Sequence, residues 1–266
     1  MPIEINDISY IYAEGTPFET VALKNISWKI EEKSMWVVLG KTGSGKTTLI
    51  QTLNGLLIPK KGEVIVDKIS TKNQKNDIKK VREKVGMVFQ YPENQFFLPT
   101  VMEEITFAPK NFNKNITQAD LYNVLNLVGL NKDFLNRNPF SLSGGEMRRV
   151  AIASVLSYNP QYIIFDEPNV GLDYDGRKKI WSIIKRLHEI GKTIIIVTHW
   201  IDELISFKPN ILHIHNNEIN YKGSFDNFIL LGEDELKKKN IVFSEKLRLY
   251  YCSLKNNIKL EKLFHY

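Results

Sequence analysis

An eight-residue stretch, GKTGSGKT from Gly40 to Thr47, constrains the fold of this chain more than any other feature. It follows a short apolar run, MWVVL, and precedes a segment with helical spacing, KTTLIQTLNGLL. The glycines leave backbone N–H groups free to surround phosphate oxygens, and the N-terminus of the following helix adds a positive dipole. The pattern therefore predicts a strand, a nucleotide-binding loop and a helix, the beginning of an α/β nucleoside triphosphatase domain.

Two side chains of this loop have the chemistry that a bound triphosphate needs. Lys46 is a mobile cation for the β- and γ-phosphate oxygens, and the hydroxyl of Thr47 is a ligand for Mg²⁺. The residues of the loop expected at the nucleotide are Gly40, Lys41, Thr42, Gly43, Ser44, Gly45, Lys46, Thr47 and Thr48.

Composition limits the possible classes of protein. The 266 residues are 43% hydrophobic and 25% charged, which suits one large α/β domain with an insertion and a short appendage. The net charge of +6 could suit nucleic acid or an anionic membrane surface, but the lysines are scattered along the chain, which favours a solvated surface. The single cysteine, Cys252, excludes a disulfide framework and a cysteine metal site. The apolar runs are too short to cross a bilayer, so we expect a soluble protein or one peripheral to a membrane.

The pattern of polar and apolar residues changes along the chain in a way that predicts a helical insertion. The first thirty residues alternate polar and apolar positions around AEGTPFET, which is typical of an antiparallel β-unit. From about 91 to 158 the spacing becomes helical. YIIFDEP and TIIIVTH then alternate with a helical segment, which predicts a parallel sheet with crossover helices. NILHIHNNEINYKGS predicts a closing hairpin, and the Lys-rich residues 226–266 predict a helical tail.

Two carboxylates and a histidine follow apolar strands of the predicted sheet. Asp166 and Glu167 end the run YIIFDEP, where side chains face the ligand crevice of an open α/β sheet. We expect Asp166 to hold Mg²⁺ and Glu167 to polarise the water that attacks the γ-phosphate. His199 ends TIIIVTH, so it is expected to reach the γ-phosphate and to hold Glu167 in line. The alternatives are an exposed carboxylate pair that binds no metal and a structural histidine.

The sequence HIH at 213 and 215 raises the question of a second metal site. We expect these two side chains to diverge and therefore not to bind one ion. Both histidines are interpreted as structural.

A second glycine-rich loop, LSGGE from 142 to 146, lies roughly a hundred residues after the first and opens another apparent helix. The hydroxyl of Ser143, the backbone amides and the helix N-terminus together form a second anion site. One chain thus carries two separate loops with phosphate-binding chemistry.

Taken in order, these motifs resemble ATP-binding cassette ATPases. The resemblance covers residues from about 3 to 225 and rests on six segments: GKTGSGKT, FQ (89–90), LSGGE, IIFDEP (163–168), GLD (171–173) and VTH (197–199). It implies an α/β fold with a P-loop NTPase (RecA-like) core, an N-terminal antiparallel β-unit, an α-helical subdomain inserted at about 91–158 and a short helical C-terminal tail. The nucleotide-binding domain is expected to span residues 1–225.

The resemblance also explains why one chain has two phosphate-binding loops. In that family two subunits pair head to tail, and each ATP lies between the first loop of one subunit and the LSGGE loop of the other. Ser143, Gly144, Gly145 and Glu146 would then contact the partner's ATP, and Asp173 would lie at the dimer seam. Gln90 would contact Mg²⁺ or the attacking water.

An aromatic ring is expected to stack on adenine. Tyr12 is the candidate for this contact, and Tyr10 competes with it. For either tyrosine, a place in the hydrophobic core is the alternative.

Three longer stretches, GTPFETVAL (15–23), VFQYPENQFFLPTVMEEITFAPKNF (88–112) and PFSLSGGEMRRVAIASVL (139–156), resemble the second paralogous ATPase type of energy-coupling factor transporters. This resemblance implies an ATPase that powers uptake of a vitamin or a transition-metal ion at the cytoplasmic face of the cell membrane. The implied partners are a second ATPase (a paralogue or a second copy), a transmembrane coupling protein and a small substrate-capturing membrane protein, with no nucleic acid. The C-terminal tail is a possible dimerisation element.

Alternatives remain at this point. The chain could serve a conventional importer fed by a binding protein, or act on nucleic acid or ribosomes. The segment from Tyr91 to Phe107 is expected to face the coupling protein, although Phe96 and Phe97 could pack inside the insertion instead. The sequence departs from the family pattern at Asn169, where a threonine is usual.

Overall fold

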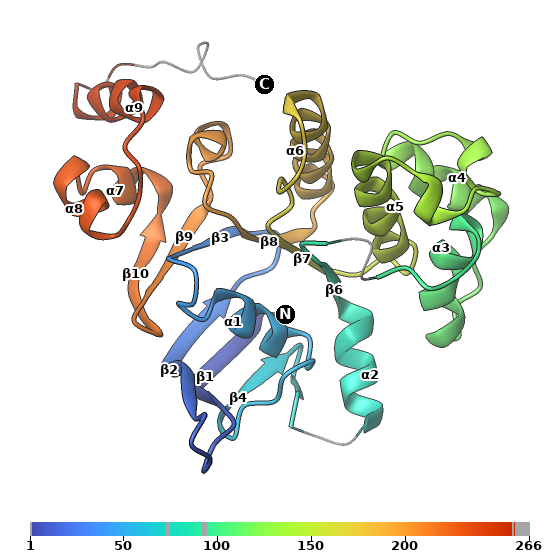
Figure 1. Ribbon diagram of the computed structural model, residues 1–266, viewed down its shortest axis with the longest axis horizontal. Coiled ribbons are helices and arrows are strands. Elements are labelled where there is room, and N and C mark those ends of the chain that lie inside the picture. Colours follow the sequence, from blue (N-terminus) through green and yellow to red (C-terminus); the bar gives the residue numbers. More distant parts are fainter. Residues whose placement is uncertain (1, 73–74, 92–94, 257, 259–266) are drawn as a thin grey trace.

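Two β-sheets and the helices packed on them form the fold (Figure 1). The structure, a computed structural model, describes residues 2–72, 75–91, 95–256 and 258. Outside this part lie residues 92–94, which belong to the segment expected to face the coupling protein, and residues 257 and 259–266 of the expected tail.

The larger sheet has six strands in the order β10-β9-β3-β8-β7-β6. β3, β6, β7, β8 and β9 run parallel, and β10 closes the sheet as the second strand of an antiparallel hairpin. The strands are β3 Met35–Leu39, β6 Val85–Val88, β7 Tyr162–Asp166, β8 Thr193–Val197, β9 Asn210–His215 and β10 Glu218–Ser224. The predicted parallel sheet and closing hairpin are both confirmed.

The smaller sheet is antiparallel and has the order β2-β1-β4-β5. Its strands are β1 Ile3–Tyr12, β2 Thr20–Ile30, β4 Lys61–Val66 and β5 Ile69–Ser70. Buried residues alternate with less buried ones in parts of both strands, at Ile3 and Ile5 of β1 and at Ile26, Trp28 and Ile30 of β2. This alternation is the polar and apolar pattern that predicted an antiparallel β-unit.

Helices cover the sheets, and one helical group is inserted between β6 and β7. α1 Lys46–Leu53 follows the glycine-rich loop, α2 Lys75–Lys84 precedes β6, and α6 Tyr174–Glu189 connects β7 to β8. The inserted group comprises α3 Val101–Asn111, α4 Gln118–Leu127, the short turns η2 Lys132–Phe134 and η3 Pro139–Ser141, and α5 Gly144–Leu156. In Figure 1 this group lies beside the β6 edge, opposite the C-terminal helices.

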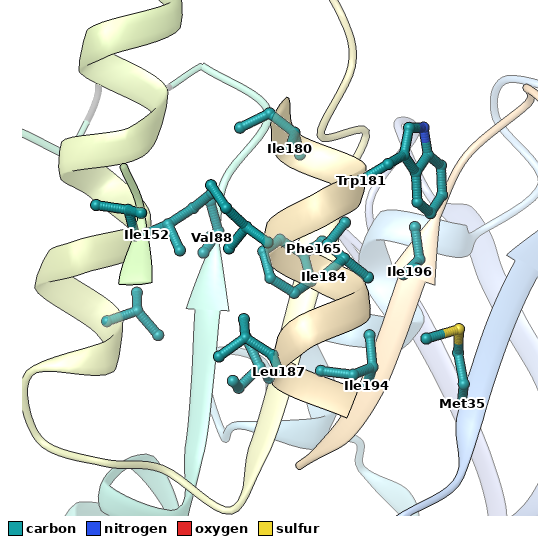
Figure 2. Close-up of a cluster of buried hydrophobic side chains, with 14 of the residues drawn as sticks. Met35, Val88, Ile152, Phe165, Ile180, Trp181, Ile184, Leu187, Ile194 and Ile196 are labelled. Carbon is teal, nitrogen blue, oxygen red and sulfur yellow. The ribbon is translucent and has the colours of Figure 1, made fainter. Parts of the chain in front are cut away.

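The six-stranded sheet has a hydrophobic core on each face. Val37 and Ile196 point to the face covered by α6, whereas the neighbouring Val38 and Ile195 point to the face covered by the smaller sheet and α1. Figure 2 shows part of the first core, to which α6 contributes Ile184, α5 contributes Ile152 and β7 contributes Phe165. Burial on both faces explains why these strands are continuous apolar runs.

The C-terminal segment forms three short helices. They are α7 Phe225–Ile229, α8 Glu233–Lys238 and α9 Glu245–Lys255. Gly232 (φ 88°) and Asn240 (φ 61°) adopt left-handed backbone conformations, which interrupt a right-handed helix. The hydroxyl of Ser244 donates to Asp202 Oδ1 at 2.6 Å, which fastens this segment to the turn η4 Asp202–Ser206.

Candidate functional site

Two glycines let the 40–47 loop pass close to other backbone segments. A Cβ at Gly40 would lie 2.4 Å from the carbonyl oxygen of Ile214, and one at Gly45 would lie 2.2 Å from that of Ala22. Gly45 also has φ 99°, a region that L-residues rarely adopt. The loop therefore requires glycine at both positions for steric reasons, whatever it binds.

Lys46 closes the loop on itself. Its ammonium group donates to the carbonyl oxygens of Gly40 and Lys41, each at 2.8 Å. Burial lowers the pKa of Lys46, and the carboxylates of Glu167 and Asp166 oppose that shift. A phosphate chain in this loop would offer the ammonium group stronger, charged acceptors in place of the two carbonyls.

Asp166 and Thr47 form a pair suited to a divalent cation. Asp166 is buried at the end of β7, and its carboxylate accepts a hydrogen bond from the Thr47 hydroxyl. Burial raises the pKa of Asp166 to about 6, with the charge of Glu167 adding to the effect. The Oδ1 atom is buried and has no hydrogen-bond partner in the described part of the chain. A desolvated carboxylate oxygen beside a hydroxyl fits the oxygen ligands that Mg²⁺ prefers.

Glu167 and His199 meet because each follows the end of one of two adjacent strands. β7 and β8 are paired with Asp166 opposite Val197, and the Glu167 N–H donates to the Val197 carbonyl at 2.9 Å. Glu167 has φ 46°, so its side chain leaves the strand direction. The Nδ1 atom of His199 lies 3.1 Å from Glu167 Oε2 and 3.2 Å from Oε1. The structure thus brings the expected catalytic carboxylate and histidine into contact.

A first cleft of about 410 Å³ gathers the expected nucleotide-binding residues. Its lining includes Gln90, Asp166 and Glu167 beside the glycine-rich loop. The remaining residues that line it are Tyr12, Thr20, Val21, Ala22, Thr42, Gly43, Gly45, Lys46, Thr47, Thr48 and Val197. Gly40, Lys41, Ser44 and His199 belong to the surrounding structure and do not line it. The motifs did not predict Thr20, Val21, Ala22 or Val197.

Of the two candidate tyrosines, Tyr12 lines this cleft and Tyr10 does not. Tyr12 is within hydrogen-bond distance of Thr48, with 3.1 Å between the two hydroxyl oxygens. Tyr10 lines a neighbouring hollow with Leu23 and packs edge-on against Tyr12. The geometry favours Tyr12 as the ring beside a nucleotide base.

A second cleft of about 420 Å³ gathers the LSGGE residues. Ser143, Gly144, Gly145, Glu146 and Asp173 all line it. Its other lining residues, which the motifs did not predict, are Arg149, Gly171, Leu172, Asp175, Gly176, Lys179 and Ile180. Among the described residues, none lines both clefts. The two predicted groups of nucleotide-contacting residues are therefore separate in one chain.

Ser143 and Asp173 are also helix caps. The Ser143 hydroxyl donates to Glu146 Oε2 at 2.9 Å and accepts from the Glu146 N–H, a reciprocal box that starts α5. The pKa of Glu146 is lowered, chiefly because its carboxylate accepts from the Ser143 N–H. Asp173 caps α6 by accepting from the Gly176 N–H at 2.7 Å. Both residues hold a helix N-terminus at the rim of the second cleft, where an anion would be stabilised.

A buried network around Glu203 was not predicted. The carboxylate of Glu203, in η4, accepts from Asn169 Nδ2 at 2.6 Å and from the indole N–H of Trp181. Burial raises the pKa of Glu203, while the bond from Trp181 and the charge of Arg177 oppose the rise. Asn169, which departs from the family pattern, thus donates a hydrogen bond within this network. A glutamate four residues after His199 was the only sequence signal.

The expectation that the side chains of His213 and His215 diverge was wrong. Residues two apart in a strand share a face, so the two rings stack with centroids 6.4 Å apart. His213 is buried with Nε2 at 3.0 Å from the Lys239 carbonyl oxygen, and burial lowers its pKa. Within the described residues, no group of three His, Cys, Asp or Glu side chains could hold a metal ion.

Comparison with known proteins identifies the family. The ABC transporter family matches residues 23–170, more than half of the chain. The chain belongs to the ABC transporter family. It is an ATPase of that family, with the nucleotide-binding motifs described above.

Its curated relatives include energy-coupling factor transporter ATP-binding proteins. The protein EcfA2 of Streptococcus agalactiae is 44% identical over 227 residues, which cover 84% of this chain and 81% of the relative. EcfA2 of Streptococcus pneumoniae is 39% identical over 255 residues, which cover 94% and 88%. The predicted resemblance to the second ATPase type is confirmed.

Solved structures confirm the fold. The ATP-binding cassette MJ0796, a dimer in a post-hydrolysis state bound to ADP and Pi, is 30% identical with a TM-score of 0.75, covering 84% of this chain and 98% of that one. CbiO1 of Clostridium perfringens, part of the ABC transporter complex CbiONQ, is also 30% identical with a TM-score of 0.75, covering 93% and 98%. None of the helices that the structure describes has both the length and the apolar composition of a membrane span.

Proposed function

We propose that this chain is the ATP-hydrolysing subunit of an energy-coupling factor importer for a vitamin or a transition-metal ion. It pairs head to tail with a second ATPase, beneath a transmembrane coupling protein and a small substrate-capturing membrane protein. It is peripheral to the cytoplasmic face of the membrane. The EcfA2 relatives support the transporter assignment, and one observation carries the head-to-tail pairing: the two clefts are separate, so each holds only part of a nucleotide site. Complete sites then require two chains.

In this proposal the residues of the first cleft perform hydrolysis. Lys46 and the loop amides hold the β- and γ-phosphates, and Tyr12 stacks on adenine. Glu167 takes a proton from the attacking water, while His199 holds the Glu167 carboxylate at the distances given above. Asp166, Thr47 and Gln90 would hold Mg²⁺, which when bound neutralises charge on the phosphates.

The metal assignment predicts the effect of Asp166→Asn. The amide removes the charge but keeps the size of the side chain, so we expect binding of nucleotide in excess EDTA to be unchanged. The enhancement of binding and hydrolysis by Mg²⁺ should fall by roughly tenfold or more. Titration of a fluorescent ATP analogue with and without Mg²⁺ measures this effect. An unchanged Mg²⁺ dependence would show that Asp166 is not a metal ligand.

Exposed aromatic side chains on the helical insertion provide a surface for the coupling protein. Phe97 is 61% exposed and packs edge-on against Phe107, which is 41% exposed, whereas Phe96 is 7% exposed and packs inside. The buried carboxylate of Glu104 accepts from the Phe97 and Leu98 N–H groups at 2.5 and 2.6 Å. The backbone that presents Phe97 is therefore fixed before any partner binds, which lowers the entropic cost of docking.

This surface predicts the effect of the double change Phe97→Ser and Phe107→Ser. We expect the variant to hydrolyse ATP normally as an isolated chain but to capture membrane proteins from detergent extracts at least roughly tenfold less well. Ile190→Ser, an exposed apolar residue at the end of α6, is the matched control and should capture normally. Equal capture by the double variant would exclude this face.

The boundary between the nucleotide-binding domain and the tail is proposed to lie at residue 225. β10 ends at Ser224, and α7 begins at Phe225. Val242, between α8 and α9, and Leu249 of α9 are 80% and 61% exposed, so the tail presents apolar side chains suited to dimer contacts.

A further inference from the structure

Arg148 is a buried cation on the helix that follows the LSGGE loop. It belongs to α5 and is only 3% exposed. Ala151, Ile152 and Val155 follow it at helical spacing and are also buried, so Arg148 lies on the core-facing stripe of the helix. A charged side chain at such a position must be satisfied by specific hydrogen bonds.

The guanidinium group of Arg148 bridges two loops, one that contains Gln90 and one that follows Glu167. Its Nη1 donates to the Phe89 carbonyl at 3.3 Å, and its Nη2 donates to the Val170 carbonyl at 3.1 Å. Phe89 directly precedes Gln90, and its own N–H donates to Gln95 Oε1 at 3.3 Å. The backbone before Gln90 is thus held on both sides.

The second carbonyl lies in the turn that starts at Glu167. The Val170 N–H donates to the Glu167 carbonyl at 3.3 Å, and the Leu172 N–H donates to the Asn169 carbonyl at 3.2 Å. These turns lead directly to Asp173, which lines the second cleft. Arg148 therefore holds a segment that begins at the expected catalytic carboxylate and ends at the expected dimer seam.

We infer that Arg148 is a positioning residue: it couples the position of α5 to the positions of Gln90 and Glu167. The inference rests on the roles proposed above for these residues and for Ser143. Arginine suits this task because its N–H groups have a fixed fork geometry, whereas a lysine offers one point charge. When α5 shifts as Ser143 engages the partner's nucleotide, the guanidinium must either carry both loops with it or lose a bond.

The test compares Arg148→Met, Arg148→Lys, Arg82→Met and Glu167→Gln in the full chain paired with its ATPase partner. Arg82 is the control: like Arg148 it donates from Nη2 to a backbone carbonyl, that of Gly55 at 3.0 Å, but it is exposed and lines neither cleft. The readouts are kcat, KM, the melting temperature, the Kd for a fluorescent ATP analogue and amide hydrogen exchange at Val170.

We expect Arg148→Met to lower kcat by roughly tenfold to a hundredfold and to change the nucleotide Kd less than about twofold. Exchange at the Val170 amide should quicken, Arg148→Lys should recover part of kcat, and Arg82→Met should match the wild type. If Arg148→Met fails to fold, Arg148→Lys is decisive: a folded Lys variant with wild-type kcat and exchange overturns the inference.

Two other outcomes separate the inference from the proposed function. A normal kcat for Arg148→Met with an inactive Glu167→Gln overturns the role of Arg148 alone. Normal hydrolysis by Glu167→Gln overturns the assignment of the catalytic carboxylate instead. A loss of melting temperature and nucleotide affinity in step with kcat would mean that Arg148 has only a structural role.

Discussion

Glu167→Gln is expected to leave ATP binding intact and to reduce hydrolysis by roughly a thousandfold. The amide has nearly the shape of the carboxylate, but it cannot take a proton from the attacking water, a function worth roughly 10²–10⁴-fold in rate. Because the γ-phosphate then stays in place, the ATP-bound dimer should accumulate. Phosphate release and light scattering on the same samples measure the two effects.

Glu63→Gln is the matched control for this change. Glu63 is partly buried and accepts from the Ser70 hydroxyl at 3.0 Å in the smaller sheet, away from both clefts. It should hydrolyse ATP at the wild-type rate and show no trapped dimer. Hydrolysis by Glu167→Gln at the control rate would remove Glu167 from the reaction.

Ser143→Arg and Lys46→Ala are expected to be inactive separately and to complement each other in mixed dimers. The arginine fills the second cleft, and the alanine removes the cation of the first. In a head-to-tail pair, the mixed dimer combines the intact first cleft of one chain with the intact second cleft of the other. Activity should return to roughly a quarter of wild type, because half of randomly paired dimers are mixed and each keeps one of two sites.

The same mixture distinguishes the alternative arrangement. If each chain used its own LSGGE loop, both chains of the mixed dimer would be defective and no activity would return. Where the partner is a paralogue, Lys46→Ala is replaced by the corresponding change in that partner. If Ser143→Arg then abolished hydrolysis only of the nucleotide bound to this chain's own first cleft, that result would contradict the trans arrangement. Samples of each variant alone set the background.

The parts of the site that the sequence predicts are those fixed by local patterns. The loop from Gly40 to Thr47 follows from steric demands that only glycine meets, and the contact of Glu167 with His199 follows from two strand ends in one sheet. Buried parallel strands are apolar throughout, so their number and their ends are visible in the sequence.

Contacts that depend on tertiary packing were not predictable in the same way. Arg148 bonds to backbone carbonyls 59 and 22 positions away, and a carbonyl leaves no trace in the sequence. The only signal was a charge on the buried stripe of α5. The tail is predicted to be helical, but the pattern did not show that backbone conformations at Gly232 and Asn240 divide it into short helices. The face shared by His213 and His215 follows from strand periodicity and should have been predicted.

The most direct test of the proposed function is mass spectrometry of the proteins that co-purify with the tagged chain from detergent-solubilised membranes of its own organism. We expect a second ATPase, a coupling membrane protein and one or more small substrate-binding membrane proteins, which would also identify the cargo. Recovery of a conventional permease pair with a binding protein, or of ribosomes or DNA-associated proteins, would contradict the assignment to an energy-coupling factor importer.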